Sequence, residues 1–429
     1  MKKEWVDKNI NNYFFNYILF PINIIGMLAD NYIITGYGFN KLKQINRIME
    51  KITINPNRLQ WCMNTSMVNI DDLSNGVNIS MQTLERAMTN QAALSVNQLE
   101  KIANFFKRSL LFFIDPNAIQ ESKIYSTQFR TINNQKPIHS IKMRALIERI
   151  QQQRQIYIGL LEDLDEPVKS NWMPDFDLST EDIKQVSADV RQWLNIPPKY
   201  NFNDLRQSVE NKGVMVFISN AYNGKWQISK SDPIRGFSLY YEILPIIMIK
   251  KQKSAVAQSF TLMHELAHLL LHKESVIDDE DDFHNYKGKE KDANEFAGNL
   301  LVPDVFLNQI NVSYLLSLEV NEYDNYLSDY KKLWCISVEA LLVRLLINKK
   351  ITQQHYQAYK DFKSSPSKKV SKKKIPRKYR HREPVHIFGK PFVYAVLDSL
   401  HSQQITLAKA SSYLDNLKIS DVHQLERYV

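Results

Sequence analysis

The sequence is poor in cysteine: its 429 residues include only Cys62 and Cys335, which are far apart and form no CxxC pair. This argues against a disulfide framework and predicts a reducing compartment, most simply the cytoplasm. Apolar residues make up 44% of the chain and charged residues 24%, as in ordinary globular proteins. The length predicts two to four domains with at least one large core.

Long hydrophobic runs are also missing. The apolar stretch 13–28 contains Asn16, Pro21 and Asn23 and falls short of the roughly 20 residues that a membrane span requires. No small-residue cleavage site follows it, so it does not fit a secretory signal peptide. We expect residues 1–48 to form a packing arm or an unstructured extension; the alternative is that natural synthesis starts at Met49.

Acidic residues are absent from one stretch, 368–382, which contains nine Lys and Arg residues. Because the whole chain has a net charge of +9, the rest of the chain is neutral. Such a run is typical of a solvated linker, and the alternative is a strap that binds nucleic-acid phosphates. It predicts a basic linker at 363–385, followed by a helical C-terminal segment at 386–429.

Residues 49–116 are predicted to form an all-α domain of short helices. Residues 70–77 have helical spacing, a turn follows at 78–79, and Ser80 is the expected N-cap of the next helix. Two helices joined by so short a turn form the helix-turn-helix arrangement. The second helix would then offer three side chains to a DNA groove: Gln82, Thr83 and Arg86.

The charge of this module favours DNA binding only weakly. Between Arg58 and Arg108 there are five basic and four acidic residues. A helical module used for packing or dimerisation therefore remains an alternative.

Residues 117–200 are predicted to be a helical linker region, with a long amphipathic packing helix at 138–166. Strands are expected at 213–219, 235–241 and 245–251, where β-branched and aromatic residues are bounded by turn residues. They predict a small three-stranded sheet. We expect the last strand to be an edge to which an extended peptide could add.

The stretch 259–272, SFTLMHELAHLLLH, is an apolar helix pattern that contains three histidines and a glutamate. His264 and His268 are four residues apart and share one helix face, which suits two imidazoles that converge on one Zn²⁺. Glu265 lies beside that face, where a carboxylate can accept a proton from water without binding the ion. The alternative for an isolated HExxH match is a core helix. His272 is expected to support the site from behind or to pack.

A second helix begins near residue 289 and could complete the site, because a catalytic zinc needs a third protein ligand and an open fourth position. Glu290 can bind the metal, and Asn294, one turn later, can orient a ligating histidine. Glu295 is a rival third ligand, but it lies on another side of the helix. The acidic stretch 274–284 is expected to be a solvated loop, or else a gate near the cleft.

The motifs FTLMHELAHLLLH and EKDANEFAGNLLVP resemble the ImmA/IrrE family of zinc metallopeptidases. Residues 49–116 resemble the XRE-type helix-turn-helix domain that is often fused in front of it, and 386–429 the helical tail of such fusions. The resemblance implies the metal ligands His264, His268 and Glu290, the general base Glu265 and one Zn²⁺ per chain.

The expected fold class is therefore α+β: a helix-turn-helix domain, a zincin-like metallopeptidase domain at 201–362 and a helical tail. The resemblance implies regulatory proteolysis of a repressor or a toxin-like partner. We expect the protein to act at DNA and not at a membrane, and it could form a homodimer. One alternative is a DNA-binding regulator or antitoxin in which the peptidase domain mainly binds a partner. Another is a purely structural zinc site.

Overall fold

The computed structural model describes most of the chain beyond residue 50. The described residues are 51–120, 140–167, 172–178, 182–220, 224–252, 254–279, 287–364 and 379–429, with Phe129, Asn133, Ile138 and Asp282. The interpretations of residues 1–48 and of most of the basic run 368–382 lie outside them. The chain divides into two compact units, one ending at Ile119 and the other running from Gln120 to Val429.

Short helices dominate the described part of the first unit. They are α3 (Pro56–Ser66), α4 (Ile70–Val77), α5 (Met81–Met88), α6 (Val96–Phe106) and α7 (Leu110–Ile114), and the strands β1 (Lys51–Ile52) and β2 (Leu94–Ser95) pair antiparallel. The leucines at 59, 73, 84 and 99 are completely buried, so the helices share one core.

Polar caps set where these helices begin and end. The Ser80 side chain accepts a hydrogen bond from the Thr83 backbone N–H, which confirms the predicted N-cap of α5. Helix α4 ends at Asn78, whose φ of 54° lies in the left-handed region that asparagine tolerates. The predicted turn at 78–79 is therefore present between α4 and α5.

The second unit is organised around a four-stranded sheet with the order β3-β5-β4-β6. Its strands are β3 (Met215–Ile218), β4 (Gly236–Leu239), β5 (Ile246–Ile249) and β6 (Val276–Asp278). Strand β5 pairs parallel with β3 and antiparallel with β4, and β4 pairs antiparallel with β6.

The expectation that the 245–251 strand forms an edge is wrong, because β5 lies between β3 and β4. The physical reason is its composition. All four residues of β5 are apolar and buried, as in strands that are covered on both faces. Among the strands that the structure describes, the sheet edges are β3 and β6.

The expected three-stranded sheet is also corrected, since part of the acidic stretch 274–284 forms the fourth strand. Val276, Ile277 and Asp278 pair with Ser238, Phe237 and Gly236 of β4. Ile277 and Asp278 are buried, so this part of the stretch is not a solvated loop.

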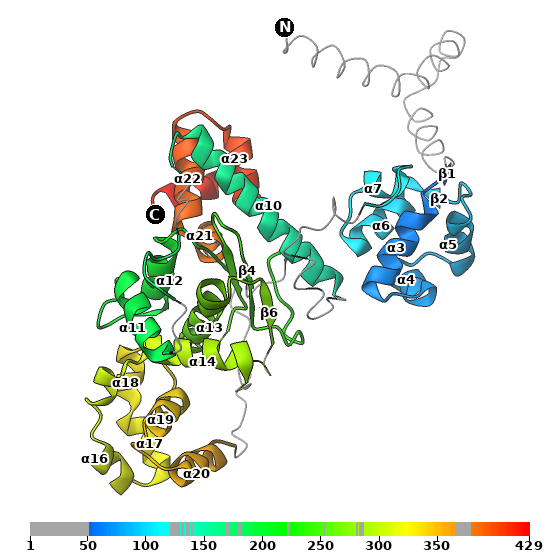
Figure 1. Ribbon diagram of the computed structural model, residues 1–429. Coiled ribbons are helices and arrows are strands. Elements are labelled where there is room, and N and C mark those ends of the chain that lie inside the picture. Colours follow the sequence, from blue (N-terminus) through cyan, green and yellow to red (C-terminus); the bar gives the residue numbers. More distant parts are fainter. Residues whose placement is uncertain are drawn as a thin grey trace, which may run out of the picture. The chain divides into compact units, whose positions relative to one another are not determined.

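Helices pack on the sheet and on one another. Helix α13 (Ala255–Ala267) contacts β4, β5 and α12 (Phe202–Glu210), while α14 (Gly288–Leu301) packs along α13 and against α11 (Ile183–Trp193). Figure 1 shows α13 beside the strands and α14 crossing next to it. The two helices that contain the HExxH and Glu290 motifs are thus direct neighbours.

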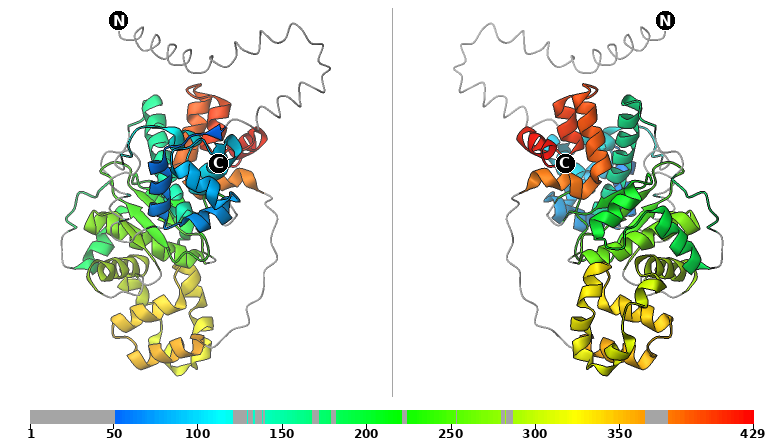
Figure 2. Two further views of the ribbon diagram at one scale, coloured as in Figure 1. Left: turned by 90° about the vertical axis from the view of Figure 1, so that its right-hand side faces the viewer. Right: turned by 90° about the vertical axis from the view of Figure 1, so that its left-hand side faces the viewer.

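Further helices extend the second unit in two directions from the sheet, as both views in Figure 2 show. On one side are α15 (Asp304–Leu307), α16 (Val312–Ser317), η4 (Val320–Glu322), α17 (Tyr323–Tyr326), α18 (Ser328–Leu333), α19 (Val338–Ile347) and α20 (Gln353–Ser364). On the other are α10 (Ile141–Asp163), η5 (Arg380–Arg382), α21 (Glu383–Phe388), α22 (Lys390–His401), α23 (Leu407–Tyr413) and α24 (Ile419–Glu426). None of the helices in the described residues is long and apolar enough to cross a membrane.

The long helix α10 confirms the amphipathic helix expected at 138–166. Leu146, Ile150 and Leu160 on its predicted apolar side are buried. The helix packs against α22, and the ring centroids of Tyr157 and Phe392 are 5.8 Å apart. Helix α10 is therefore a packing helix that joins the C-terminal helices to the rest of the second unit.

A buried arginine fastens α21 to the sheet. The Arg206 guanidinium donates to Glu210 Oε1 at 2.7 Å and to the carbonyl oxygen of Val216 in β3. It also donates to the carbonyls of Val385 and His386 in α21, at 3.2 and 2.8 Å. One cation thus links α12, the edge strand β3 and the C-terminal helices.

We expect His386 to make the free energy of unfolding fall at acidic pH. Burial lowers the pKa of His386 to about 3, and the nearby cations Lys251 and Arg206 add to the effect, whereas the pKa of an unfolded histidine is about 6.5. Below pH 6.5 the unfolded chain therefore binds a proton that the folded chain does not, and stability is lost as the pH falls from 6.5 toward 3. His386→Gln should reduce the loss between pH 6.5 and pH 5 by about 1–2 kcal/mol in urea unfolding.

The matched control is His423→Gln, since His423 is exposed on α24. This variant should keep the pH dependence of the unmodified chain. An unchanged pH dependence in His386→Gln would contradict the expected role of His386.

Candidate metal centre

The HExxH helix places two imidazoles side by side in a fully buried position. His264 lies in α13 and His268 opens the π-helix η2 (His268–His272) that continues it; both are 0% exposed. Their Nε2 atoms are 3.1 Å apart. The i, i+4 spacing therefore brings two nitrogen lone pairs to one point.

Glu290 faces these histidines from α14. Its Oε2 atom lies 3.3 Å from Nε2 of His264 and 3.6 Å from Nε2 of His268. The rival Glu295 is instead near the guanidinium of Arg344: burial lowers the pKa of Arg344, and the charges of Asp304 and Glu295 oppose this effect. The structure thus brings Glu290, and not Glu295, to the two histidines.

A fourth residue, Asp278, belongs to the cluster and is not among the site residues predicted from the sequence. Its Oδ2 atom lies 3.5 Å from Nε2 of each histidine, and the side chain is 1% exposed. The nitrogen and oxygen atoms of His264, His268, Asp278 and Glu290 all lie within 4.8 Å of one another. The only signal in the sequence is the short β-branched pair Val276–Ile277, which predicts a strand just before Asp278.

Side chains behind the histidines fix their orientation. The His264 Nδ1–H donates to Asn294 Oδ1 at 3.0 Å, which leaves the lone pair of a neutral ring on Nε2, facing the cluster. His268 Nδ1 is 3.0 Å from His272 Nδ1. Asn294 and His272 therefore lie where the sequence analysis expects supporting residues.

His272 lies one turn beyond His268, at the end of the π-helix η2. The two residues are four apart, the same spacing that brings His264 and His268 together, and π-helical turns are frequent at functional sites. Burial, followed by the charges of His268 and Lys289, lowers the pKa of His272 to about 4. His272 is therefore neutral at pH 7, and its Nδ1 can accept a hydrogen bond from the His268 Nδ1–H, which leaves the His268 lone pair on Nε2, facing the cluster.

The pKa value of each residue in the cluster depends on its contacts with the others. Burial alone would lower the pKa of His264, but hydrogen bonding and charge from Asp278 and Glu290 outweigh it and raise the pKa to about 9. For Glu290, contact with the two histidines outweighs burial and lowers the pKa. Without a metal, the Nε2 atom of His264 would therefore hold a proton at neutral pH, and a bound cation would displace that proton.

Glu265 lies next to the cluster and is completely buried. Burial raises its pKa well above the ordinary value, and the charge of Asp278 raises it further. A divalent cation in the cluster would favour the charged form of this carboxylate.

The residues of the cluster fit a divalent metal. Oδ2 of Asp278 and Oε2 of Glu290 are buried and lie 3.3–3.6 Å from the imidazole Nε2 atoms, and the carboxylate of Glu265 is completely buried beside them. Buried carboxylates require a cation or donors to offset desolvation. Two imidazole nitrogens with two carboxylate oxygens form a donor set that binds transition metals.

The proposed DNA-contacting residues lie in the first unit, on α5. Gln82 and Arg86 are exposed, and Arg86 Nε donates to Gln91 Oε1 at 3.3 Å. The Thr83 hydroxyl is 2.8 Å from the Ser80 hydroxyl, so part of its hydrogen-bonding capacity is used in capping α5.

Gly236 in β4 provides the space for Glu265. A Cβ atom at this position would lie 2.4 Å from Glu265 Oε1 and 2.9 Å from Thr261 Cγ2. We expect Gly236→Ala to lower the free energy of unfolding by about 1–3 kcal/mol, because the overpacked carboxylate and helix must shift. Gly159→Ala in α10 is the matched control, since a Cβ there meets nothing within 4 Å.

The control should raise stability by about 0.5–1 kcal/mol, as alanine does in a helix interior. Chemical unfolding of both variants gives the comparison. Equal stability of Gly236→Ala and the unmodified chain would show that the space beside Glu265 is not restricted.

Glu290 and Glu295 form a second matched pair. Glu290→Gln should weaken Zn²⁺ binding by at least about tenfold, because it removes a charged oxygen from the cluster. Glu295→Gln should leave binding unchanged, since its carboxylate acts on Arg344. Competition with a chromophoric chelator measures both affinities, and the reverse order would assign the metal to Glu295.

Comparison with protein families supports a metallopeptidase-type domain in the second unit. Residues 210–346, which are 137 of the 429 residues, match the Peptidase_M78 family model, described as the IrrE N-terminal-like domain. No match was found among curated proteins or among solved structures. The matched region contains the whole sheet and the helices α13 and α14. This part of the chain is therefore similar to the peptidase domain of the ImmA/IrrE family.

Proposed function

We propose that the protein is a zinc-dependent endopeptidase that acts in regulatory proteolysis. The observation that supports this most directly is the convergence of His264, His268 and Glu290 on one point, with the buried carboxylate of Glu265 beside it. The Peptidase_M78 match over the same residues agrees with a hydrolase.

Zinc is the metal that we propose for the cluster, with one ion per chain. His264, His268 and Glu290 would hold it, and imidazole and carboxylate donors are common ligands of catalytic zinc. A bound Zn²⁺ would polarise the scissile carbonyl and make water a better nucleophile.

Glu265 would act as the general base. Its carboxylate lies next to the proposed ligands, and Gly236 leaves the space that it occupies. It can accept the proton of the attacking water and later pass it to the leaving amine. Asn294 and His272 would keep the two imidazoles in position through their Nδ1 atoms.

The proposed substrate is an extended segment of a repressor or a toxin-like partner protein. Strand β5 cannot receive it, because β5 is paired on both sides. Strand β6 is an edge of the sheet and contains Asp278, so a peptide that adds to β6 would lie beside the cluster.

The first unit would bring this activity to DNA. Helices α4 and α5 are joined by a short turn, and Gln82 and Arg86 of α5 are exposed. With Thr83, these side chains would enter a groove, and the basic run 368–382 would add contacts to phosphates. The protease would then act where its partner is bound.

One observation favours a second candidate function. Asp278 supplies a fourth protein atom to the cluster, and four protein ligands are typical of structural zinc sites. In that case the domain would mainly bind a partner within a DNA-binding regulator or antitoxin, and hydrolysis would be absent.

The Glu265→Gln variant separates the two functions. It keeps the proposed metal ligands but cannot accept a proton, so it should bind Zn²⁺ normally and capture an uncut partner. The unmodified chain should cleave the captured protein, and Glu265→Gln should be about 10²–10⁴-fold slower.

Glu274→Gln is the control, because Glu274 is partly exposed and pairs with Lys289 at the surface. Peptide mapping by mass spectrometry measures the cleavage rate. Equal cleavage by Glu265→Gln and the unmodified chain would eliminate Glu265 as the base, and no cleavage by any form would favour the regulator.

A further inference from the structure

Strand β6 holds the Asp278 side chain against the metal cluster. Asp278 pairs with Gly236 of β4, and its carbonyl oxygen accepts a hydrogen bond from the Arg235 N–H at 2.8 Å. Successive side chains of a strand point to opposite faces. The register therefore turns Asp278 toward the HExxH helix α13, on which β4 packs.

Five of the six distances between the four ligand atoms are close to the edges of one tetrahedron, and the sixth, between the Asp278 and Glu290 oxygens, is within 4.8 Å. Ligands at 2.0–2.1 Å from a tetrahedral Zn²⁺ would be about 3.3–3.4 Å apart. The two Nε2 atoms are 3.1 Å apart, and Glu290 Oε2 lies 3.3 and 3.6 Å from them. Asp278 Oδ2 lies 3.5 Å from both Nε2 atoms, which is the same spacing.

Asp278 is placed where it can share a cation with the histidines. Its Oδ2 atom is buried, and its distance of 3.5 Å to each Nε2 atom is long for an N–H···O hydrogen bond. The groups close to it are the two Nε2 atoms and the carboxylates of Glu265 and Glu290. Two further carboxylates next to Asp278 favour a cation between them, because it would offset their mutual repulsion.

We infer that Asp278 is a fourth protein ligand of the metal, and that the resting centre is closed to water and to other small ligands. The inference rests on the metal-binding half of the proposed function, and not on hydrolysis. A catalytic zinc keeps a position for water, so Asp278 must leave the metal before Glu265 can act on a water molecule.

Strand β6 provides a route for this release. It has only three residues and lies at the sheet edge, where an extended substrate would pair. A peptide that pairs with β6 would therefore lie next to Asp278, the ligand that has to leave the metal. Binding of the substrate would then release Asp278 and open the coordination position for water.

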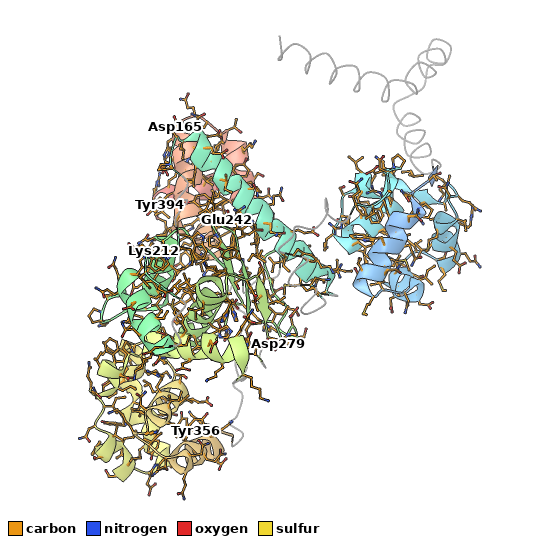
Figure 3. The ribbon with its side chains drawn as sticks, viewed as in Figure 1. Asp165, Lys212, Glu242, Asp279, Tyr356 and Tyr394 are labelled. Carbon is orange, nitrogen blue, oxygen red and sulfur yellow. The ribbon has the colours of Figure 1, made fainter. Side chains whose placement is uncertain are left out.

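The first measurement is the affinity for Zn²⁺ in chelator competition. Asp278→Asn and Asp278→Ala should each bind Zn²⁺ at least about tenfold more weakly, since a direct ligand contributes no less than the groups behind it. The matched control is Asp279→Asn, which makes the same chemical change one residue further along (Figure 3). This control should keep the affinity of the unmodified chain.

The second measurement reports whether the metal centre is closed and compares the unmodified chain with Asp278→Ala. In the Co²⁺-loaded full chain, the visible absorption should be unaffected by acetohydroxamate, because the fourth position is filled. In Co²⁺-loaded Asp278→Ala the spectrum should shift on addition of the same compound, because the position is vacant. Thermal unfolding of the metal-free variants establishes that each is folded.

The inference is overturned if both Asp278 variants bind Zn²⁺ as tightly as the unmodified chain. It is equally overturned if acetohydroxamate shifts the Co²⁺ spectrum of the unmodified chain. The proposed hydrolysis fails separately, through absent cleavage of a captured partner, and that outcome leaves the metal measurements unaffected. If Asp278→Ala does not fold, the Zn²⁺ affinity of Asp278→Asn and the Co²⁺ spectrum of the unmodified chain test the inference.

Discussion

The structure of the second unit depends on how the negative charge that is buried between α13, α14 and β6 is offset. Two imidazoles and the carboxylates of Asp278 and Glu265 are buried there, and the partly exposed Glu290 meets them from α14. Without a cation these acids repel one another, and a proton on His264 offsets only part of their charge. The surrounding structure is arranged around the same point, since Asn294 and His272 orient the rings and Gly236 leaves space for Glu265.

Those parts of the site that follow from helix geometry could be predicted from the sequence. An α-helix has about 3.6 residues per turn, so residues four apart lie on the same face. This places His264 and His268 on one face of their helix, and Glu290 and Asn294 on one face of α14. The apolar side of α10 and the N-cap at Ser80 are local in the same sense. In each case the residues that decide the outcome are close together in the chain.

Asp278 and the strand order could not be predicted in this way, because they depend on pairing between distant segments. Nothing in the acidic run separates Asp278 from Asp279 except the register of β6 against β4, and a slip of one residue would exchange their faces. The central position of β5 likewise depends on its pairing with β3, some 30 residues earlier in the chain. Only the unbroken apolar run of β5 indicates that both of its faces are covered.

The Arg206 contacts have a consequence for the solubility of the protein. An exposed edge strand is a template for pairing with another chain and so for aggregation. In this protein α21 lies against β3, and Arg206 occupies the Val216 carbonyl of that strand. The C-terminal helices therefore cover one edge of the sheet. A chain shortened before residue 383 would expose the β3 edge, and other copies of the chain could pair with it and aggregate.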